Sequence, residues 1–385
     1  MSLLNVAKRG WRLLTQWRYY LLSSVGRPVV VRGSADSGRA FLGFYSRWKS
    51  NQNTVFRDSF TMLDWISASA LIDLSTEGSV KRQRLKVPGH FRCGPRSNPL
   101  AAWEGCDVAD LFYTESATIS YMKINIRKKF EPLRKENLGL SYLFGTGNSL
   151  SDASNFDWSD GYRIVCNTIV KSESTWKSLN PHIIVAADGL YHFSQSSHAR
   201  KFRSDLIARF RERPALFVYP VRFHAIVSQE LQEFSDWLMP MPEGNHESLS
   251  VSIDEAGGSP KGIGNILNIL LLPIGCSLAK DVRLIGFDGR KAEDKLFWTN
   301  SATHSYPDLI EELHREYPAF FQDHVPANDP LKYVRTYHGD ALENRLVEAE
   351  SLGWQFSLLF ESTTAPLQKR YRPEKKPPEK LNQNK

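Results

Sequence analysis

The stretch Leu143-Phe144-Gly145-Thr146-Gly147-Asn148-Ser149-Leu150 decides how the second half of this chain folds. The apolar residues that lead into it predict a buried strand, and the small polar residues after the glycines predict the start of a helix. Glycine at such a turn lets a ligand approach the main chain, and free N–H groups at a helix start attract phosphate. The stretch therefore favours a strand, a turn and a helix around a nucleotide, with a tight turn that binds nothing as the alternative.

Two further predicted strands, 163–167 and 183–188, also end in polar residues, Asn167 and Asp188. Ligands of an open parallel sheet lie beyond the carboxyl ends of its strands, so Gly145, Asn167 and Asp188 are expected to line one crevice. The glycines are not followed by Lys-Ser/Thr, and the third glycine of a dinucleotide fingerprint is absent. Neither P-loop chemistry nor NAD binding is expected.

The charge of the chain is concentrated at its ends. The 385 residues carry a net charge of +7, but residues 1–33 hold six Lys/Arg and no acid, and residues 368–385 hold seven Lys/Arg and two Glu. The part between the ends is therefore acidic overall. No zinc finger, RNA-binding aromatic motif or basic-aromatic stripe runs through it, so nucleic acid is not an expected partner.

The chain is expected to be cytoplasmic. Its four cysteines, Cys93, Cys106, Cys166 and Cys276, are scattered and are typical of reduced structural thiols. Basic residues interrupt Leu3–Leu22, which excludes a secretory signal. No run reaches the roughly 20 apolar residues of a membrane-spanning helix.

Residues 3–22 have the pattern of a basic amphipathic helix with tryptophans on the apolar side. Arg18 intrudes on that apolar side. One interpretation is a helix packed on its own protein. The other is peripheral contact with the inner face of a membrane, and the sequence leaves both open.

Beyond Leu138, strand-like and helix-like segments alternate, as in βαβ units. Strands are predicted at 139–145, 162–167, 182–187, 215–219, 281–286 and 354–360. Helices are predicted at 115–136, 173–179, 197–212, 264–278, 306–316 and 340–352. The expected fold class is α/β, with a Rossmann-like, mostly parallel sheet flanked by helices. The expected domains are a mainly helical N-terminal extension over 1–135 (with Val29–Val31 a short strand and a helix within 58–74), a nucleotide-binding catalytic domain over 136–365 and a disordered basic tail over 366–385.

A second glycine cluster, Lys261-Gly262-Ile263-Gly264-Asn265, precedes an apolar helix and then a strand that ends in Phe287-Asp288-Gly289-Arg290. Asp288 and Arg290 are expected at the same sheet edge as Asn167 and Asp188. The guanidinium of Arg290 suits the oxygens of a departing phosphate. A plain Asp-Gly turn with a solvated arginine is the alternative.

One histidine is placed to act as a base. His338 lies just ahead of the last predicted helix, where an imidazole can accept a proton near neutral pH. His192, His304 and His324 are rival candidates.

The order of these motifs resembles the small bacterial sialyltransferases that use CMP-sialic acid, and the Rossmann-like surface-polysaccharide proteins related to them. The resemblance covers about residues 138–362. Those proteins share Gly-x-Gly-x-Ser-Leu after a first strand, Cys-Asn at the end of the next, Gly-x-Asp after a later strand and a histidine before the last helix. The matches here are Gly145–Leu150, Cys166-Asn167, Gly286–Asp288 and His338.

The resemblance implies an inverting glycosyltransferase that acts without a metal or another cofactor. It implies that residues 145–149 and Asn167 hold the nucleotide, that Gly262 and Gly264 hold the donor sugar, and that His338 deprotonates the acceptor hydroxyl. The implied partners are a nucleotide-sugar donor, CMP-linked by preference and carrying a nonulosonic acid such as sialic acid, and a surface-glycan acceptor. The chain differs from the family at Thr146 and Asn148, where sialyltransferases have Asn and Pro. It also differs at Asp188, where they have Asn, and at Arg290, where they have the first of two phosphate-binding tyrosines.

Two alternatives belong to other classes. A similar glycine turn occurs in archaeal pterin diphosphokinases, which use ATP and Mg²⁺; Asp188, Asp254 and Asp288 would then supply oxygen ligands for the metal. The other alternative is a Rossmann-like scaffold without catalytic activity, which would bind no nucleotide.

Overall fold

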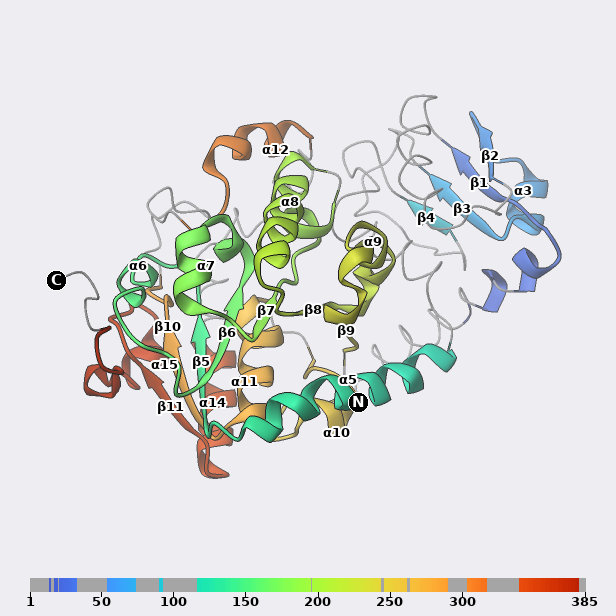
Figure 1. Cartoon of the computed structure of the whole chain (residues 1–385). Coiled ribbons are helices and arrows are strands. Elements are labelled where there is room, and N and C mark those ends of the chain that lie inside the picture. The colour runs from blue at the N-terminus through green and yellow to red at the C-terminus, as the bar shows by residue number, and fades with distance from the viewer. Residues whose placement is uncertain are drawn as a thin grey trace. The chain divides into compact units, whose positions relative to one another are not determined.

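The computed structural model describes residues 14, 17–19, 21–32, 54–73, 90–92, 116–194, 196–243, 246–261, 264–289, 303–316 and 339–380. The chain divides into two compact units (Figure 1). The first consists of Met1–Glu115 with Phe193–Ser196 and Glu311–Val325, and the second contains the rest. The helix expected at 115–136 belongs to the second unit.

The second unit is built on a seven-stranded sheet with the strand order β11-β10-β5-β6-β7-β8-β9. Every neighbouring pair in it is parallel. The strands are β5 (Leu140–Phe144), β6 (Tyr162–Cys166), β7 (Ile183–Val185), β8 (Leu216–Pro220), β9 (Leu238–Met241), β10 (Asp281–Ile285) and β11 (Gln355–Leu358). The α/β fold class is thus confirmed, and the six strands predicted in this unit are found within a few residues of their expected limits.

Helices lie on both sides of this sheet (Figure 1). They are α5 (Ser116–Glu136), α6 (Leu150–Ala153), α7 (Glu173–Leu179), α8 (Ser197–Glu212), α9 (His224–Glu230), α10 (Ile253–Ala256), α11 (Leu272–Leu278), α14 (Ala341–Ser351) and α15 (Ala365–Gln368). Short turns of other helix types are η2 (Asn167–Lys171), η3 (Gly189–Phe193), η4 (Val221–Phe223), η5 (Gln232–Trp237), η6 (Leu267–Leu271), η7 (Pro307–Leu309) and η11 (Pro373–Lys375). Ile310 of the second unit begins α12 (Ile310–Glu316).

The strands are nearly continuous apolar runs because both faces of the sheet are covered. Alternate residues, such as Leu143 and Ile164, join one core with Phe130 of α5, Leu271 of η6 and Leu346 of α14. The other face is rich in aromatic side chains: the rings of Tyr142 and Phe144 meet the edge of Trp158, and Phe217 packs on Phe202 and Phe210 of α8.

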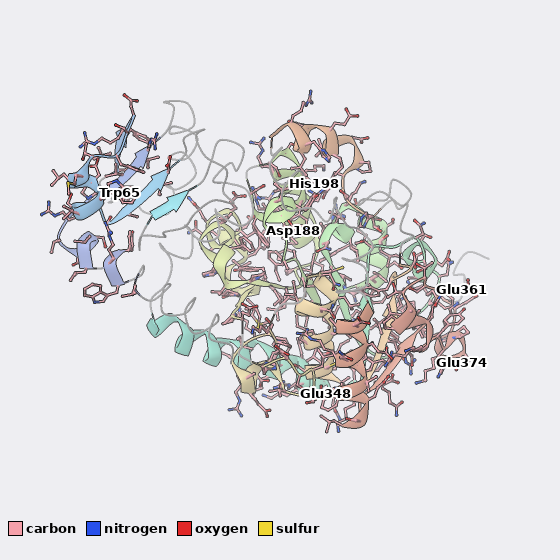
Figure 2. The ribbon with its side chains drawn as sticks, turned by 180° about the vertical axis from the view of Figure 1, so that it is seen from behind. Trp65, Asp188, His198, Glu348, Glu361 and Glu374 are labelled. Carbon is pink, nitrogen blue, oxygen red and sulfur yellow. The ribbon has the colours of Figure 1, made fainter. Side chains whose placement is uncertain are left out.

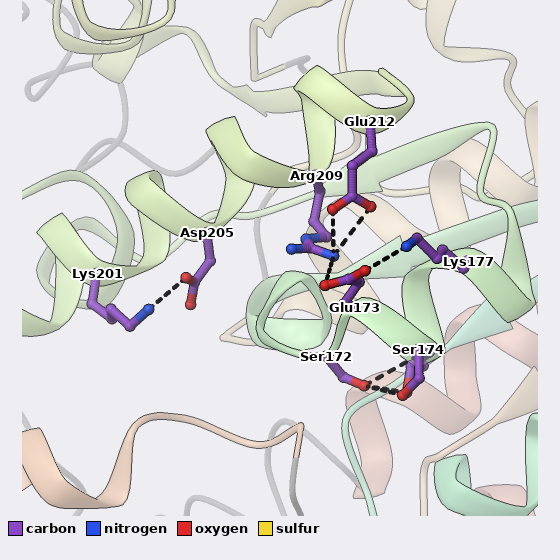
Figure 3. A network of polar contacts seen from close by, with 9 residues as sticks. Ser172, Glu173, Ser174, Lys177, Lys201, Asp205, Arg209 and Glu212 are labelled. Atoms are coloured by element: carbon purple, nitrogen blue, oxygen red, sulfur yellow. Dashed lines mark hydrogen bonds and ion pairs between the residues drawn. The ribbon is translucent and has the colours of Figure 1, made fainter.

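On this aromatic face, an ion pair joins α7 and α8, and a second pair lies within α8 (Figure 3). Arg209 of α8 lies 3.5 Å from a carboxylate oxygen of Glu173 on α7 and 3.0 Å from one of Glu212. The carboxylate partners are partly exposed, and such pairs contribute little, so the buried aromatic contacts hold α8 on the sheet.

β9 is a strand that the sequence did not reveal. Its four residues, Leu-Met-Pro-Met, include Pro240, which argues against a central strand. Among the described strands, β9 lies at an edge of the sheet and pairs with β8 alone, with Pro240 opposite Tyr219. A proline is tolerated there because an edge strand does not need all its N–H donors.

Helical residues outnumber strand residues in the described part of the N-terminal extension, residues 1–135, but the extension also holds a sheet that was not expected as a whole. It contains a four-stranded parallel sheet of order β2-β1-β3-β4, formed by β1 (Val29–Arg32), β2 (Thr54–Arg57), β3 (Ala70–Asp73) and β4 (His90–Arg92). The helix expected within 58–74 is shorter: α3 (Met62–Ser67) ends where Ala68 turns to an extended backbone. The apolar run after it pairs with β1 instead of continuing the helix.

The C-terminal tail is ordered over its described residues, which corrects the prediction of disorder from 366 on. Arg370 is buried and pairs with Glu343 (2.7 Å) and Glu350 (2.6 Å) of α14. Further along, the amide of Lys380 donates to the carbonyl of Asn155 at 2.8 Å. The proline- and lysine-rich composition hid these contacts because they depend on acidic and main-chain partners from elsewhere in the chain.

Candidate functional site

The candidate site lies where the order of the strands reverses. From β5 the chain builds outward through β6, β7, β8 and β9, and it then returns to the other side of β5 as β10 and β11. A crevice at the carboxyl ends of the strands is the usual ligand site at such a switch point. The sequence-predicted residues after β5, β6, β7 and β10 all fall at this edge: Gly145–Ser149, Asn167, Asp188 and Asp288.

The glycine turn is explained first by packing between β5 and β10. The amide of Gly145 donates to the carbonyl of Ile285 at 2.7 Å, and the amide of Gly147 donates to that of Gly286 at 2.9 Å. A β-carbon on Gly147 would lie 2.5 Å from a carboxylate oxygen of Asp288 and 2.8 Å from the Gly286 carbonyl oxygen. The two strand ends can therefore meet only if this position has no side chain.

Asp288 occupies the place that an anionic ligand was expected to take at this turn. Its carboxylate accepts a 2.9 Å hydrogen bond from the amide of Ser149 and another from the Ser149 hydroxyl. The following helix, α6, has only four residues. The Ser149 amide is thus satisfied inside the protein, while the side chain of Thr146 is buried and Asn148 is exposed.

Asn167 has a different environment. It follows β6 with a left-handed backbone, φ 51°, and its amide oxygen is buried without a hydrogen-bond partner among the described residues. Buried polar atoms are nearly always paired, so such an atom calls for an explanation. Asn180 shares both properties but lies just ahead of β7, at the opposite edge of the sheet. Of these two residues, Asn167 lies at the carboxyl edge of the sheet, where ligands of such sheets usually bind.

Asp188 begins a tight turn after β7. Its carboxylate accepts hydrogen bonds from the amides of Leu190 (2.9 Å) and Tyr191 (3.0 Å) at the start of η3, a single π-helical turn. Burial raises the pKa of Asp188 to about 6, although these two hydrogen bonds oppose the shift. The carboxyl thus titrates close to neutral pH, and it suits a hydroxyl or amine better than a phosphate.

A segment far along the chain, Thr303–Tyr306, crosses this edge, and sequence reasoning missed it. The Thr168 hydroxyl donates to the carbonyl of Thr303 and accepts from the amide of Ser305, at 2.7 and 2.8 Å. His304 Nδ1 lies 2.7 Å from the hydroxyl of Thr146. The sequence signal for this segment is His304, one of the rival candidates for the base.

The imidazoles at this edge are held neutral. The pKa of His304 falls to about 4 because of burial and, secondarily, the neighbouring His198. Burial likewise lowers the pKa of His198 to about 4 and that of His192 to about 3. His198 links two parts of the site, since its ring nitrogens lie 2.9 Å from the Tyr191 carbonyl oxygen and from the Ser305 hydroxyl. Figure 2 labels Asp188 and His198 at this end of the second unit.

Several predicted residues are not part of this described cluster. Gly262, Arg290 and His338 lie outside the described residues, as does His324. Gly264 is exposed, with φ 64°, on the loop ahead of η6. The buried guanidinium of Arg345 on α14 donates to the carbonyls of Lys261 (2.6 Å) and Asn268 (2.8 Å) and so anchors the two ends of this loop.

The three carboxylates considered for a metal site do not come together. Asp254 forms a 2.5 Å ion pair with Arg134, near the end of α5 and hence near the amino end of β5. Asp188 and Asp288 lie at the carboxyl edge, on either side of the sheet's central strands. Within the part of the chain that the structure describes, no group of three His, Cys, Asp or Glu side chains could hold a metal ion.

No family model matches this chain, and neither a curated protein nor a solved structure does. In the described segments, no helix has the length and apolar character needed to cross a membrane. Of the four cysteines, Cys166 and Cys276 are described, and both are buried free thiols.

Proposed function

We propose that this protein is a nucleotide-sugar-dependent glycosyltransferase whose donor nucleotide binds at the carboxyl ends of β5, β6 and β7. The observation that carries the proposal is the buried amide oxygen of Asn167 at this edge, which has no hydrogen-bond partner among the described residues. An amide can both donate to and accept from the edge of a nucleobase, and burial makes the missing hydrogen bond costly until a ligand supplies it.

The chemistry around Asn167 supports a nucleoside rather than a bare phosphate. The carboxyl of Asp188 and the hydroxyl of Thr146 can form hydrogen bonds with ribose hydroxyls or base amines. The amide of Ser149 already donates its hydrogen bond to Asp288, so it is not left for a phosphate. The motifs of the sialyltransferase-like family also fall at strand ends here: the glycine turn after β5, Cys166-Asn167 at the end of β6 and Gly286–Asp288 after β10. A CMP-linked donor and a glycan acceptor are the partners that this resemblance favours.

A thermal-shift panel with CMP, CDP, UDP, GDP and ATP, each with and without Mg²⁺, tests the proposal. We expect CMP to raise the unfolding midpoint without Mg²⁺, by an amount equivalent to about 2.7 kcal/mol when CMP is at 100 times its Kd. Stabilisation by ATP only with Mg²⁺ would instead favour a diphosphokinase. No stabilisation by any nucleotide would favour a scaffold without catalytic activity.

The Asn167→Gly variant tests the carrying observation directly. Glycine keeps the left-handed backbone and removes only the amide, so the fold should persist while most of the CMP-induced shift is lost. Asn180→Gly is the matched control, because Asn180 has φ 48° and the same unpartnered oxygen at the other edge. Equal shifts in the two variants would show that Asn167 does not contact the nucleotide.

The transferase chemistry is tested at His338. We expect His338→Ala to lower transfer from a CMP-linked sugar by about 10²- to 10⁴-fold, the usual contribution of a general base, while the CMP-induced thermal shift persists. Release of CMP can be followed with and without a glycan acceptor. Transfer at the wild-type rate in this variant would assign the base to another residue.

A further inference from the structure

The first unit exposes a stripe of apolar side chains on its N-terminal helical residues. Leu14, Trp17 and Leu21 are 52, 65 and 50% exposed, and Val25, in the turn that follows, is 66% exposed. Spacings of three and four residues put these side chains on one side of a helix. Tyr19 points the other way and is fully buried, so the inner side of the segment is packed.

The short helix α3 has the same arrangement. Met62, Leu63 and Ile66 are 82, 70 and 68% exposed. Contacts at its start nonetheless hold this helix in place. Thr61 and Asp64 form a reciprocal capping box, and the rings of Phe60 and Trp65 pack edge to face. The exposed side chains therefore belong to an anchored helix and not to a frayed one.

Arg18 joins these two segments into one surface. Its guanidinium donates to the carbonyl oxygens of Trp65 (2.6 Å) and Ala68 (3.2 Å) at the end of α3. In the sequence Arg18 interrupts the apolar side of the amphipathic pattern. In the structure its guanidinium binds main-chain carbonyls within the unit. The apolar face is defined by the exposed side chains of both segments: Leu14, Trp17, Leu21, Val25, Met62, Leu63 and Ile66.

The charges of this unit indicate what covers the apolar face. Residues 1–33 contain six Lys/Arg and no acid. Asp73 pairs with Arg32 (3.5 Å) and so offsets one of these six charges, whereas Asp64 pairs with Arg57 (3.6 Å), which lies outside residues 1–33; an excess of positive charge remains in the sequence of this segment. Exposed apolar side chains in a segment whose sequence carries an excess of positive charge fit the interface of an anionic bilayer. We propose that the apolar face docks on an anionic lipid surface.

The proposal is tested by co-sedimentation of the full chain with phosphatidylcholine vesicles that contain about 30% phosphatidylserine, compared with phosphatidylcholine alone. We expect binding to the anionic vesicles only. The paired variants Met62→Glu/Ile66→Glu and Trp17→Glu/Leu21→Glu should each lower the partition coefficient by about tenfold or more, because each removes apolar area and adds repulsive charge.

The matched control is Val347→Glu/Leu352→Glu in the second unit, where both side chains are about half exposed, at 50 and 52%. This control should bind the anionic vesicles as the wild type does. Circular dichroism and the thermal midpoint check the fold of each variant, and Met62→Ser/Ile66→Ser replaces a charged variant that does not fold.

Three results would overturn the proposal. The first is equal binding to neutral vesicles, and the second is unchanged binding in both variants of the apolar face. The third is a lipid-free dimer that Met62→Glu/Ile66→Glu dissociates, which would show that the face is covered by a second copy of the chain.

Discussion

Single residues at the carboxyl edge have roles that depend on what surrounds them. Asn167 and Asn180 have the same side chain, nearly the same φ and the same unpaired oxygen, and only the strand end that each adjoins separates them. Gly147 looks like part of a phosphate-binding turn, yet its first role is to leave room for Asp288 and the Gly286 carbonyl.

Gly147→Ala should therefore destabilise the protein even without a ligand. The added β-carbon meets a carboxylate oxygen and a main-chain oxygen, and the main chain cannot move aside cheaply. We expect a loss of about 1–3 kcal/mol in the free energy of unfolding, measured by urea denaturation. Ser151→Ala, at an exposed site on α6, is the control and should change stability by less than about 0.5 kcal/mol. A fully stable Gly147→Ala protein would mean that the two strand ends are not in contact.

At the scale of elements, the C-terminal segment closes the far side of the sheet. Arg370 follows α15 and pairs with two carboxylates of α14, and the main chain around it forms a bridge between Leu358 and Tyr371. A segment with a disordered composition thus acts as a brace between β11 and α14.

Arg370→Met should weaken this brace by leaving Glu343 and Glu350 without their buried partner. Since these carboxylates are partly exposed, at 24 and 35%, we expect a loss of about 1–3 kcal/mol, below that of a fully buried pair. Lys369→Met is the matched control: Lys369 pairs with the same Glu343, but its side chain is 64% exposed, so the loss should stay under about 1 kcal/mol. Equal effects of the two changes in a thermal melt would contradict the bracing role.

At the scale of the whole molecule, buried histidines dominate the response to acid. Burial lowers the pKa of His192 to about 3 and those of His182, His198, His224 and His304 to about 4. An unfolded histidine takes up its proton near pH 6.5, so the unfolded state binds more protons as the pH falls from about 6.5 to 4. Stability is therefore lost over this range.

The contribution of Asp188 to stability changes with pH in the opposite direction. Its raised pKa lets the folded state bind a proton before the unfolded state does, between about pH 6 and 4, so this contribution grows as the pH falls. We expect the free energy of unfolding to fall overall as the pH is lowered, because each buried histidine contributes up to about 1.4 kcal/mol per pH unit. Urea unfolding between pH 7.5 and 4.5 measures the slope. His304→Asn should make it shallower and Asp188→Asn steeper, and a wild-type profile that is flat below pH 6.5 would refute this assignment.

The sequence determined the parallel sheet of the second unit almost completely. Apolar runs of strand length alternate there with amphipathic helices, and polar residues follow the strands, so local pattern alone placed Gly145, Asn167, Asp188 and Asp288 at one edge. Of the N-terminal sheet, the strand at Val29–Val31 was expected; the rest of the sheet was hidden because its strands are short, with β4 only three residues long, and are far apart in the sequence. The proline in β9 likewise argued against a strand there, and it is tolerated because β9 lies at the edge of the sheet.

Only the tertiary structure decided which of these residues meet. Asp254 pairs with Arg134 at the opposite edge, and the Ser149 amide donates a hydrogen bond to Asp288. Thr303–Tyr306 contacts Thr168 and His198. Arg370 forms ion pairs with two glutamates. Each contact joins residues from separate segments of the chain, and several of them bury a polar group. Burial of such a group costs free energy unless a partner forms a hydrogen bond or ion pair with it. Local pattern carries no information about such partners, because they are selected by the packing of the whole unit.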